Sequence, residues 1–241
     1  MLVDARQGQP PPASVVARPG IEVLVAGPGE AVDVPADAPE ATLFHALVSA
    51  ASAPMCLWQR SGDLPTPDRV DLMLNAILRL GAPVVAHRPP SPQTSGGSGK
   101  LIRIPIEAVA RGGTLHPDTI AFRRDIAHFA PTVDQHRHGT RRALLAWAAM
   151  RDTVGFLDRA LVARPPTPPP EAGQLAQRQA RATQAALTVV DTFVALSAPK
   201  PVTDLAVRQV LAASERWTWT HWSLLVHRHK PRWTPPEGIT P

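Results

Sequence analysis

The segment from Thr114 to Ala163 constrains the fold of this chain more than any other, because it contains two amphipathic patterns joined by a loop rich in histidine and arginine. Pro117 fits the first turn of a helix, where the missing N–H of proline costs nothing. Apolar side chains then recur at spacings of four and three residues up to Pro131, at Phe122, Ile126 and Phe129. The segment therefore begins with a predicted helix.

A second amphipathic pattern begins after Gly139. Its apolar side chains recur at heptad-like spacing, which is typical of a helix that packs against a core. The residues that form this stripe are Leu144, Trp147, Met150, Val154, Leu157 and Leu161. The segment therefore predicts two core helices, separated by the loop that follows Pro131.

Asp158 is the acidic residue that this second helix would place at the edge of its buried face. A helix advances by roughly 100° per residue, so Asp158 would point within about 20° of the direction of Trp147. A buried carboxylate is costly unless it is paired. We expect a structural salt bridge between Arg123 and Asp158. Arg151, on the same helix as Asp158, is the alternative partner, and a position in water is the other alternative.

The rest of the chain adds mostly helices, each with a start signal and one apolar face. These predicted helices span residues 39–53, 66–80, 171–198 and 203–216. Apolar residues alternate on both sides of a Gly-Pro-Gly turn and predict a short β-hairpin over residues 21–34. Three isoleucines between residues 102 and 106 predict a short edge strand, which a proline interrupts.

These patterns together predict a mainly α protein with a single helical-bundle core, a short N-terminal β-hairpin and extended proline-rich arms. The predicted divisions are an N-terminal arm with the hairpin over residues 1–38, a helical core domain over residues 39–216, and a tryptophan- and arginine-rich C-terminal arm over residues 217–241. A chain of 241 residues, 44% hydrophobic and 19% charged, is long enough and apolar enough to bury such a core.

Several kinds of site and targeting signal lack support in the sequence. The single cysteine, Cys56, excludes an internal disulfide and a cysteine-rich zinc site. Two histidine pairs, at 136/138 and 227/229, lack nearby further ligands, so no metal site and no cofactor are predicted. The glycine-rich run before Lys100 fails the spacing of a phosphate-binding P-loop. Because no signal-peptide pattern and no membrane-spanning apolar run are present, we expect an intracellular protein with no membrane partner.

The cationic residues point to a polyanionic partner. Lys and Arg number 25 against 20 Asp and Glu, which gives a net charge of +5. Most of the cations are arginines, whose planar side chains suit contacts with phosphates and bases. Phosphate contacts produce sequence-tolerant, salt-sensitive binding of nucleic acid. Five arginines cluster along the two predicted core helices, and we expect them to bind RNA: Arg123, Arg124, Arg141, Arg142 and Arg151.

Three short motifs resemble the coat proteins of flexible filamentous plant viruses. They are Phe-Ala-Pro at residues 129–131, Trp-Ala-Ala-Met-Arg-Asp at 147–152 and Phe-Leu-Asp at 156–158, followed by a proline-rich exit. The resemblance implies an arginine–aspartate pair beside an RNA groove in a protein that polymerises. By composition, the basic, alanine- and proline-rich chain is also similar to the proline–alanine–serine-rich proteins that coat the RNA of polymycoviruses.

The sequence and these resemblances predict a structural coat (nucleocapsid) protein that is not an enzyme. It would polymerise around viral RNA, single- or double-stranded, into a flexible helical filament, and would occur in the virion and the host cytoplasm. The alternative is a basic helical regulator from a high-GC cellular genome that binds nucleic acid or protein. Apolar side chains of the hairpin and the tail are expected to form subunit contacts, although the tryptophans also suit base stacking. These residues are Ile21, Val23, Val25, Trp217, Trp219 and Trp222.

Overall fold

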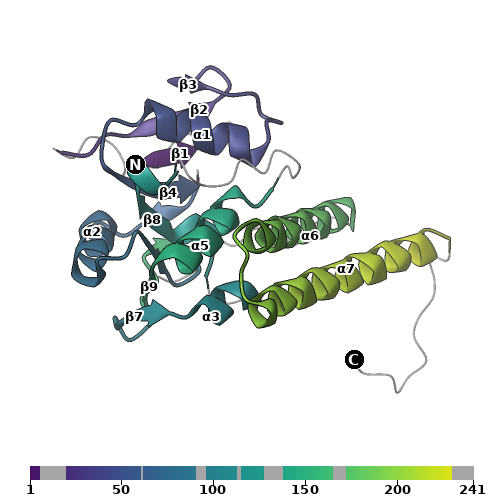
Figure 1. The fold of residues 1–241 in the computed structure, drawn as a ribbon. Coiled ribbons are helices and arrows are strands. Elements are labelled where there is room, and N and C mark those ends of the chain that lie inside the picture. Colours follow the sequence, from purple (N-terminus) through teal and green to yellow (C-terminus); the bar gives the residue numbers. More distant parts are fainter. Residues whose placement is uncertain are drawn as a thin grey trace.

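A computed structural model of the protein describes residues 1–5, 20–60, 62–90, 96–112, 115–127, 138–164 and 172–229, and within the last range it describes the side chains of residues 174–216. The fold is mixed α/β. An eight-stranded, mostly parallel sheet has helices on both faces (Figure 1). The prediction of a mainly α helical bundle is therefore wrong.

The sheet has the strand order β3-β2-β1-β4-β8-β6-β9-β7. Strands β8 and β7 run antiparallel to their neighbours, and the other pairs are parallel. From β1 the chain moves outward to β2 and β3, and then returns to the other side of β1 with β4. The strands are β1 (Leu2–Asp4), β2 (Leu24–Gly27), β3 (Val32–Asp33), β4 (Met55–Arg60), β6 (Val84–His87), β7 (Leu101–Ile104), β8 (Ile120–Arg123) and β9 (Val154–Leu157). A separate antiparallel pair consists of β5 (Leu64–Pro65) and β10 (Val162–Ala163).

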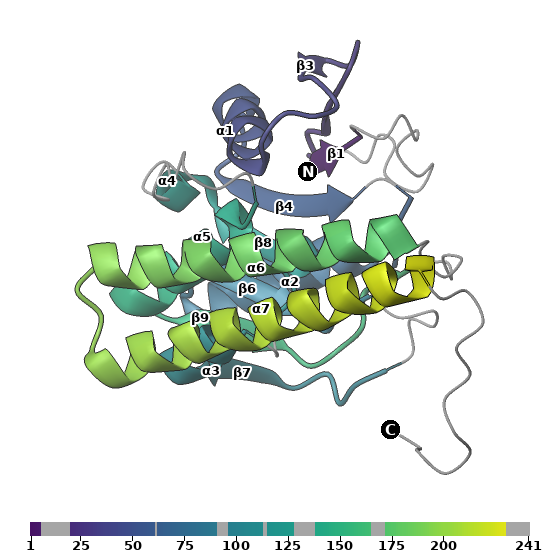
Figure 2. The same ribbon diagram turned by 90° about the vertical axis from the view of Figure 1, so that its right-hand side faces the viewer.

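Helix α2 covers one face of the sheet, and α1, α3 and α5 cover the other (Figure 1). Helices α6 and α7 lie side by side in a hairpin that packs outside α3 and α5 (Figure 2). The helices are α1 (Glu40–Ala50), α2 (Arg69–Leu80), α3 (Ile106–Arg111), α4 (Arg124–Ala127), α5 (Thr140–Arg151), α6 (Ala172–Ala195) and α7 (Lys200–His229), with a 3-10 turn, η2, at Pro117–Thr119.

Strand β9 replaces the second half of the helix that we predicted over residues 140–163. Helix α5 ends at Arg151, and the following residues Asp152, Thr153 and Gly155 all have low helix propensity. Every residue of β9 is buried, because both faces of the sheet are covered there. A strand buried on both faces appears in sequence as a continuous apolar run, so its residues continued the helical stripe by chance.

Strand β8 likewise replaces the middle of the helix predicted to end at Pro131. Ile120 and Phe122 pack into the core beneath α1 and α5, whereas Ala121 packs into the core beneath α2. Opposite directions for successive side chains are the period of a strand. Of the rest of the predicted helix, Pro117–Thr119 form η2 and Arg124–Ala127 form the short α4, and residues 128–137, including Pro131, lie outside the described ranges.

The predicted hairpin over residues 21–34 is wrong, because β2 and β3 are parallel. Strand β2 pairs with β1, with Val25 opposite Val3, so the expected arm supplies a strand to the interior of the sheet. Ile21 and Val23 precede β2 and are half-buried. Helices are present where we predicted them at residues 39–53, 66–80 and 171–198, and β7 is an edge strand as predicted.

Helix α7 continues through the region that we expected to form a C-terminal arm. It extends to His229, so Trp217, Trp219 and Trp222 lie within a helix, although their side chains are outside the described part. In the portion of the chain that the structure covers, no helix combines the length and the apolar character needed to cross a membrane.

Gly139 is expected to be essential for packing α5 against α6. Its φ is +111°, and a Cβ placed there would lie 2.8 Å from the Cα of Ala185 in α6. We expect Gly139→Ala to lower the free energy of unfolding by about 2 kcal/mol or more, because backbone strain and overpacking add. Urea denaturation measures the loss. Gly81→Ala is the matched control, since Gly81 has a positive φ but open space around it; equal losses in the two variants would contradict the packing argument.

Candidate functional site: an arginine–carboxylate network at the carboxyl edge of the sheet

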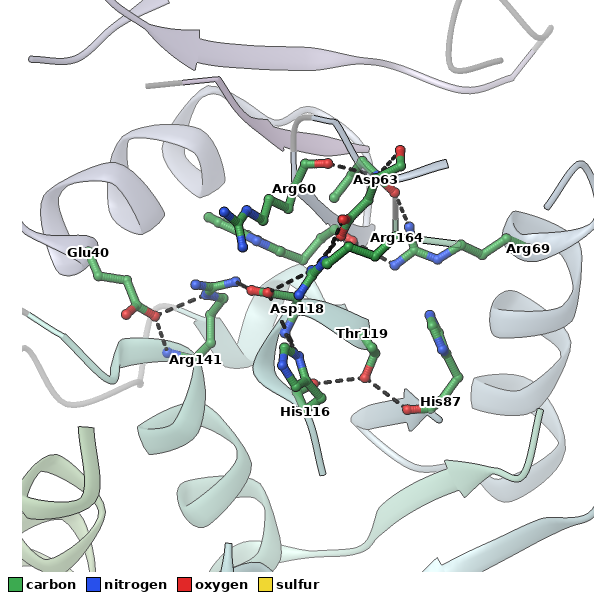
Figure 3. A network of polar contacts seen from close by, with 12 residues as sticks. Glu40, Arg60, Asp63, Arg69, His87, His116, Asp118, Thr119, Arg141 and Arg164 are labelled. Atoms are coloured by element: carbon green, nitrogen blue, oxygen red, sulfur yellow. Dashed lines mark hydrogen bonds and ion pairs between the residues drawn. The ribbon is translucent and has the colours of Figure 1, made fainter. Parts of the chain in front are cut away.

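Polar side chains gather at the edge where the parallel strands β1, β4 and β6 end, which we call the carboxyl edge. The three strands end there at Asp4, Arg60 and His87. Helices α1, α2 and α5 begin near this edge and contribute side chains from their first turns. Six buried or half-buried charged residues form what we call the edge network (Figure 3): Glu40, Asp63, Arg69, Asp118, Arg141 and Arg164.

Arg141 is the central cation of the edge network. Its Nε donates to Oε1 of Glu40 at 2.9 Å, and its Nη1 donates to Asp118. Glu40 also accepts hydrogen bonds from the backbone N–H groups of Gly139, at 2.8 Å, and of Arg141 itself, at 3.1 Å. The guanidinium lies 4.4 Å from the ring centroid of Trp58, in cation–π geometry. Arg141 therefore joins the starts of α1 and α5 to η2.

Arg164 extends the network to the end of β4. It forms a bidentate pair with Asp63, with two N···O distances of 2.6 Å, and its Nη2 also donates to Oδ2 of Asp118 at 3.1 Å. Asp118 is thus shared between two arginines. Bidentate arginine–carboxylate pairs fix geometry as well as charge, so the network holds this edge of the sheet in one arrangement.

Burial opposes ionisation of the two acids that Arg141 contacts, but their partners outweigh it. The Arg141 guanidinium and the Gly139 and Arg141 N–H groups lower the pKa of Glu40. Arg141, His116 and Arg164 lower the pKa of Asp118 well below its ordinary value. Burial likewise opposes the charge of Arg141, but Glu40 and Asp118 raise its pKa. All three groups are therefore charged at neutral pH.

Arg69 is a buried cation without a carboxylate in direct contact among the described residues. It is 1% exposed, and its guanidinium donates to the side-chain oxygen of Gln59 and, at 2.8 Å, to the carbonyl of Trp58. Burial lowers the pKa of Arg69 to about 10, although Asp63 and Asp118 oppose this shift. Its Nε has no partner within the described part of the chain. Arg69 remains protonated at pH 7 and places a fixed positive charge behind the network.

His87 ends β6 below Arg69 and is neutral (Figure 3). Burial and the nearby Arg69 charge lower its pKa to about 3. Its Nδ1 lies 2.7 Å from the carbonyl oxygen of Arg88 and therefore carries the proton, which leaves Nε2 as an acceptor with no partner among the described residues. The Thr119 hydroxyl donates near the same strand end, to the His87 carbonyl at 2.9 Å.

Arg60 is the exposed cation at this edge. It ends β4, and its side chain extends toward the side on which Glu40 and Arg141 lie (Figure 3). Among the described residues, no carboxylate forms an ion pair with its guanidinium. The three carboxylates of the edge network balance the three guanidiniums of the same network. Arg60 therefore adds positive charge at the solvent side, which suits an anionic ligand.

Asp158 has different partners from those we predicted. It accepts hydrogen bonds from Arg88, from the Ser98 hydroxyl at 2.6 Å and from the Ser98 N–H at 3.1 Å. These hydrogen bonds, led by that of the Ser98 hydroxyl, lower the pKa of Asp158. Arg123 instead pairs with the exposed Asp125. Asp158 therefore fixes the glycine-rich run before Lys100 against the end of β9 and does not link two helices.

The five arginines predicted to bind RNA lie in separate places and do not form one groove. Arg123 and Arg124 lie at the opposite edge, where β4 begins, and Arg124 donates to the carbonyl of Ala51. Arg151 is exposed at the end of α5. Arg141 belongs to the edge network, and Arg142 faces a cavity among the helices. Their proximity in sequence was therefore a poor guide to their positions.

Sequence reasoning missed most of the edge network, although one signal was present. The buried stripe of α2 consists of Arg69, Met73, Ala76 and Ile77. An arginine in the first turn of an otherwise apolar stripe is the signal for a buried cation. The predicted exclusion of metal sites has no direct test: no cluster of three or more potential metal-binding side chains occurs in the described ranges, and His136, His227 and His229 lack described side chains.

Comparisons with known proteins give a fold but no sequence family. The sequence matches no protein-family model and no curated protein. Three crystal structures of Staphylococcus aureus TarS, residues 1–349, are similar in fold. The TM-score is 0.53 at 10% identity for the first, 0.55 at 8% identity for the complex with UDP, and 0.54 at 11% identity for the complex with UDP-GlcNAc. Each alignment covers 88% of this chain, and they cover 70%, 69% and 71% of TarS, respectively.

This similarity contradicts the coat-protein prediction. The chain has the α/β fold of a protein crystallised with a nucleotide and a nucleotide sugar, and the resemblance to viral coat proteins was wrong. The motifs that suggested it belong to unrelated elements: residues 147–152 lie in and just after α5, residues 156–158 lie in and just after β9, and residues 129–131 fall outside the described ranges. The same similarity contradicts three further predictions. These are viral RNA as a partner, assembly into a helical homopolymer, and a protein that is not an enzyme.

Proposed function

We propose that this protein is a glycosyltransferase-type enzyme that binds a nucleoside diphosphate sugar at the carboxyl edge. The observation that carries the proposal is the shared fold with TarS over 88% of the chain, because TarS has been crystallised with UDP and with UDP-GlcNAc. UDP is the part of UDP-GlcNAc that remains when the sugar is transferred, so the two ligands together point to glycosyl transfer.

The topology supports this location for the ligand. In open α/β sheets, ligands bind in the crevice outside the carboxyl ends of the strands, where the strand order reverses. Here the order reverses between β1 and β4, which are neighbours in the sheet and end at Asp4 and Arg60. The edge network lies beside this position and would form one rigid wall of a site there.

The charges at this edge divide into a scaffold and a contact group. Glu40, Asp63 and Asp118 are already bonded to arginines, so they are suited to hold the wall in place. Arg60 is exposed and can reach a ligand at the position between β1 and β4 where the strand order reverses. We assign it to the diphosphate, because a guanidinium presents planar N–H donors that match phosphate oxygens.

Isothermal titration calorimetry of the full chain with UDP and UDP-GlcNAc tests the proposal. We expect both to bind, and Arg60→Ala to weaken binding about tenfold or more, since hydrogen bonds to charged groups contribute roughly 1.5–3 kcal/mol. Arg79→Ala is the matched control, because Arg79 is exposed near the end of α2, away from the carboxyl edge, and should leave the affinity unchanged.

Two results would contradict the proposal. Absence of binding to UDP, ADP and GDP sugars at millimolar concentration would reject the nucleotide-sugar site. Equal affinity in the wild type and Arg60→Ala would remove Arg60 from the site. The transfer reaction is tested separately from binding by incubating the protein with UDP-GlcNAc, with water as the acceptor. Chromatography then measures the UDP that is released.

A further inference from the structure

A cavity lies between the helices, away from the carboxyl edge proposed for the nucleotide sugar. It has a volume of about 270 Å³, and residues of α3, α5, α6 and α7 line it. We call it the helical groove. Most of its lining side chains are small, and its polar residues are two arginines and a glutamine. The lining residues are Ala110, Gly112, Arg142, Ala182, Ala186, Val189, Ala206, Gln209, Ala213 and Arg216.

Arg142 is the feature of the groove that requires explanation. Its side chain is half-buried beside Gly112, and Nη1 would lie 3.5 Å from a Cβ at that position. Among the described residues, no side chain or carbonyl accepts a hydrogen bond from its guanidinium. Burial lowers the pKa of Arg142, whereas burial of its neighbour Arg141 is overcome by two carboxylates in direct contact. A guanidinium withdrawn from water without a carboxylate in contact is costly.

The rest of the groove is also suited to negative charge. Arg216 enters from α7, where its Nε donates to the carbonyl of Ala212 at 3.1 Å, and it brings a second cation to the same cavity. Gln209 adds an amide, which can donate hydrogen bonds. None of the lining residues is acidic. The other lining residues are alanines, one glycine and one valine, so they fill little of the cavity.

We propose that the helical groove is a binding site for the phosphate group of a small ligand, held by Arg142 and Arg216. Arginine forks match the geometry of phosphate oxygens, with which a guanidinium forms paired, charge-assisted hydrogen bonds. The site is separate from the nucleotide crevice and does not depend on the function proposed above.

Binding of inorganic phosphate to the full chain tests this site, by calorimetry at constant ionic strength. We expect the wild type to bind in the millimolar range or tighter, and Arg142→Gln to weaken binding at least tenfold. Arg208→Gln is the matched control, because Arg208 is exposed on α7 and does not line the groove. In the Arg60→Ala variant, phosphate binding at the helical groove should persist, which separates this site from the proposed nucleotide site.

A second variant keeps the test valid if Arg142→Gln does not fold. Ala182→Leu keeps both arginines, is made at an exposed position of α6, and places a larger side chain in the groove, so it should also block phosphate. Three results would overturn the proposal: no phosphate binding by the wild type up to about 10 mM; unchanged binding in Ala182→Leu; or loss of all phosphate binding in Arg60→Ala.

Discussion

Replacing Arg141 with alanine is expected to lower the free energy of unfolding by about 3–5 kcal/mol, the range for removing one partner of a buried ion pair. The cause is that two largely buried carboxylates would lose the cation that compensates their charge. Arg141 is the guanidinium shared by Glu40 and Asp118, and the three side chains are 10–12% exposed. Glu40 would keep its two backbone N–H donors, and Asp118 would keep Arg164. The loss should therefore fall within this range and not far above it.

Urea denaturation of the wild type and the variant measures this loss. Arg123→Ala is the control, because Arg123 also contacts an aspartate, but its side chain and that of Asp125 are 50% and 55% exposed. Exposed ion pairs contribute about 0–1 kcal/mol, so the control should be nearly neutral. If Arg141→Ala destabilised the protein by less than 1 kcal/mol, the edge network would not be the rigid wall on which the proposed site depends.

His87 is expected to make the protein sensitive to mild acid. Its pKa in the folded protein is about 3, below its ordinary value of 6.5, so the unfolded chain binds a proton first as the pH falls. The stability associated with neutral His87 is fully present above pH 6.5 and is lost as the pH falls toward 3. Between pH 7 and pH 4 this residue alone should cost about 3 kcal/mol, at 1.36 kcal/mol per pH unit.

The variant His87→Asn isolates this contribution. Its amide nitrogen can donate to the Arg88 carbonyl in place of Nδ1, and it does not titrate. Denaturation curves at several pH values should show that the wild type loses about 3 kcal/mol more than the variant between pH 7 and pH 4. Protonation of Asp118, whose pKa is lowered in the folded protein, also destabilises the protein in acid. This loss is the same in the wild type and the variant, so it cancels in the difference between them. Parallel curves for the two proteins would show that His87 is not buried in its neutral form.

Elements with local signals were predictable from the sequence. Helices α1, α2 and α6 each have a one-sided apolar pattern and a start or stop residue, such as Pro39 before α1 and Gly81 after α2. Edge strand β7 was also predictable, since its isoleucines alternate. In these cases the burial pattern arises from the residues of one element, so a window of sequence contains the information.

The central strands β8 and β9 required the tertiary structure. Both are covered on two faces: Phe122 and Val154 pack on the side of α1 and α5, whereas Ala121 and Leu157 pack on the side of α2. An apolar run of this kind satisfies a helical spacing as easily as an extended one. The pairing of β2 with β1 was equally hidden, because β1 is three residues long and only its position between β2 and β4 makes it a strand.

The candidate site was decided almost entirely by long-range pairing. The sequence by itself determined that the chain is rich in arginine, that it has a single cysteine, and where several helices begin and end. It did not determine which charges meet, because Glu40 and Arg141 are 101 residues apart, as are Asp63 and Arg164. A carboxylate reaches an arginine across such a separation only when the strands between them have taken their order in the sheet. The edge network, and with it the proposed function, therefore belongs to the tertiary structure.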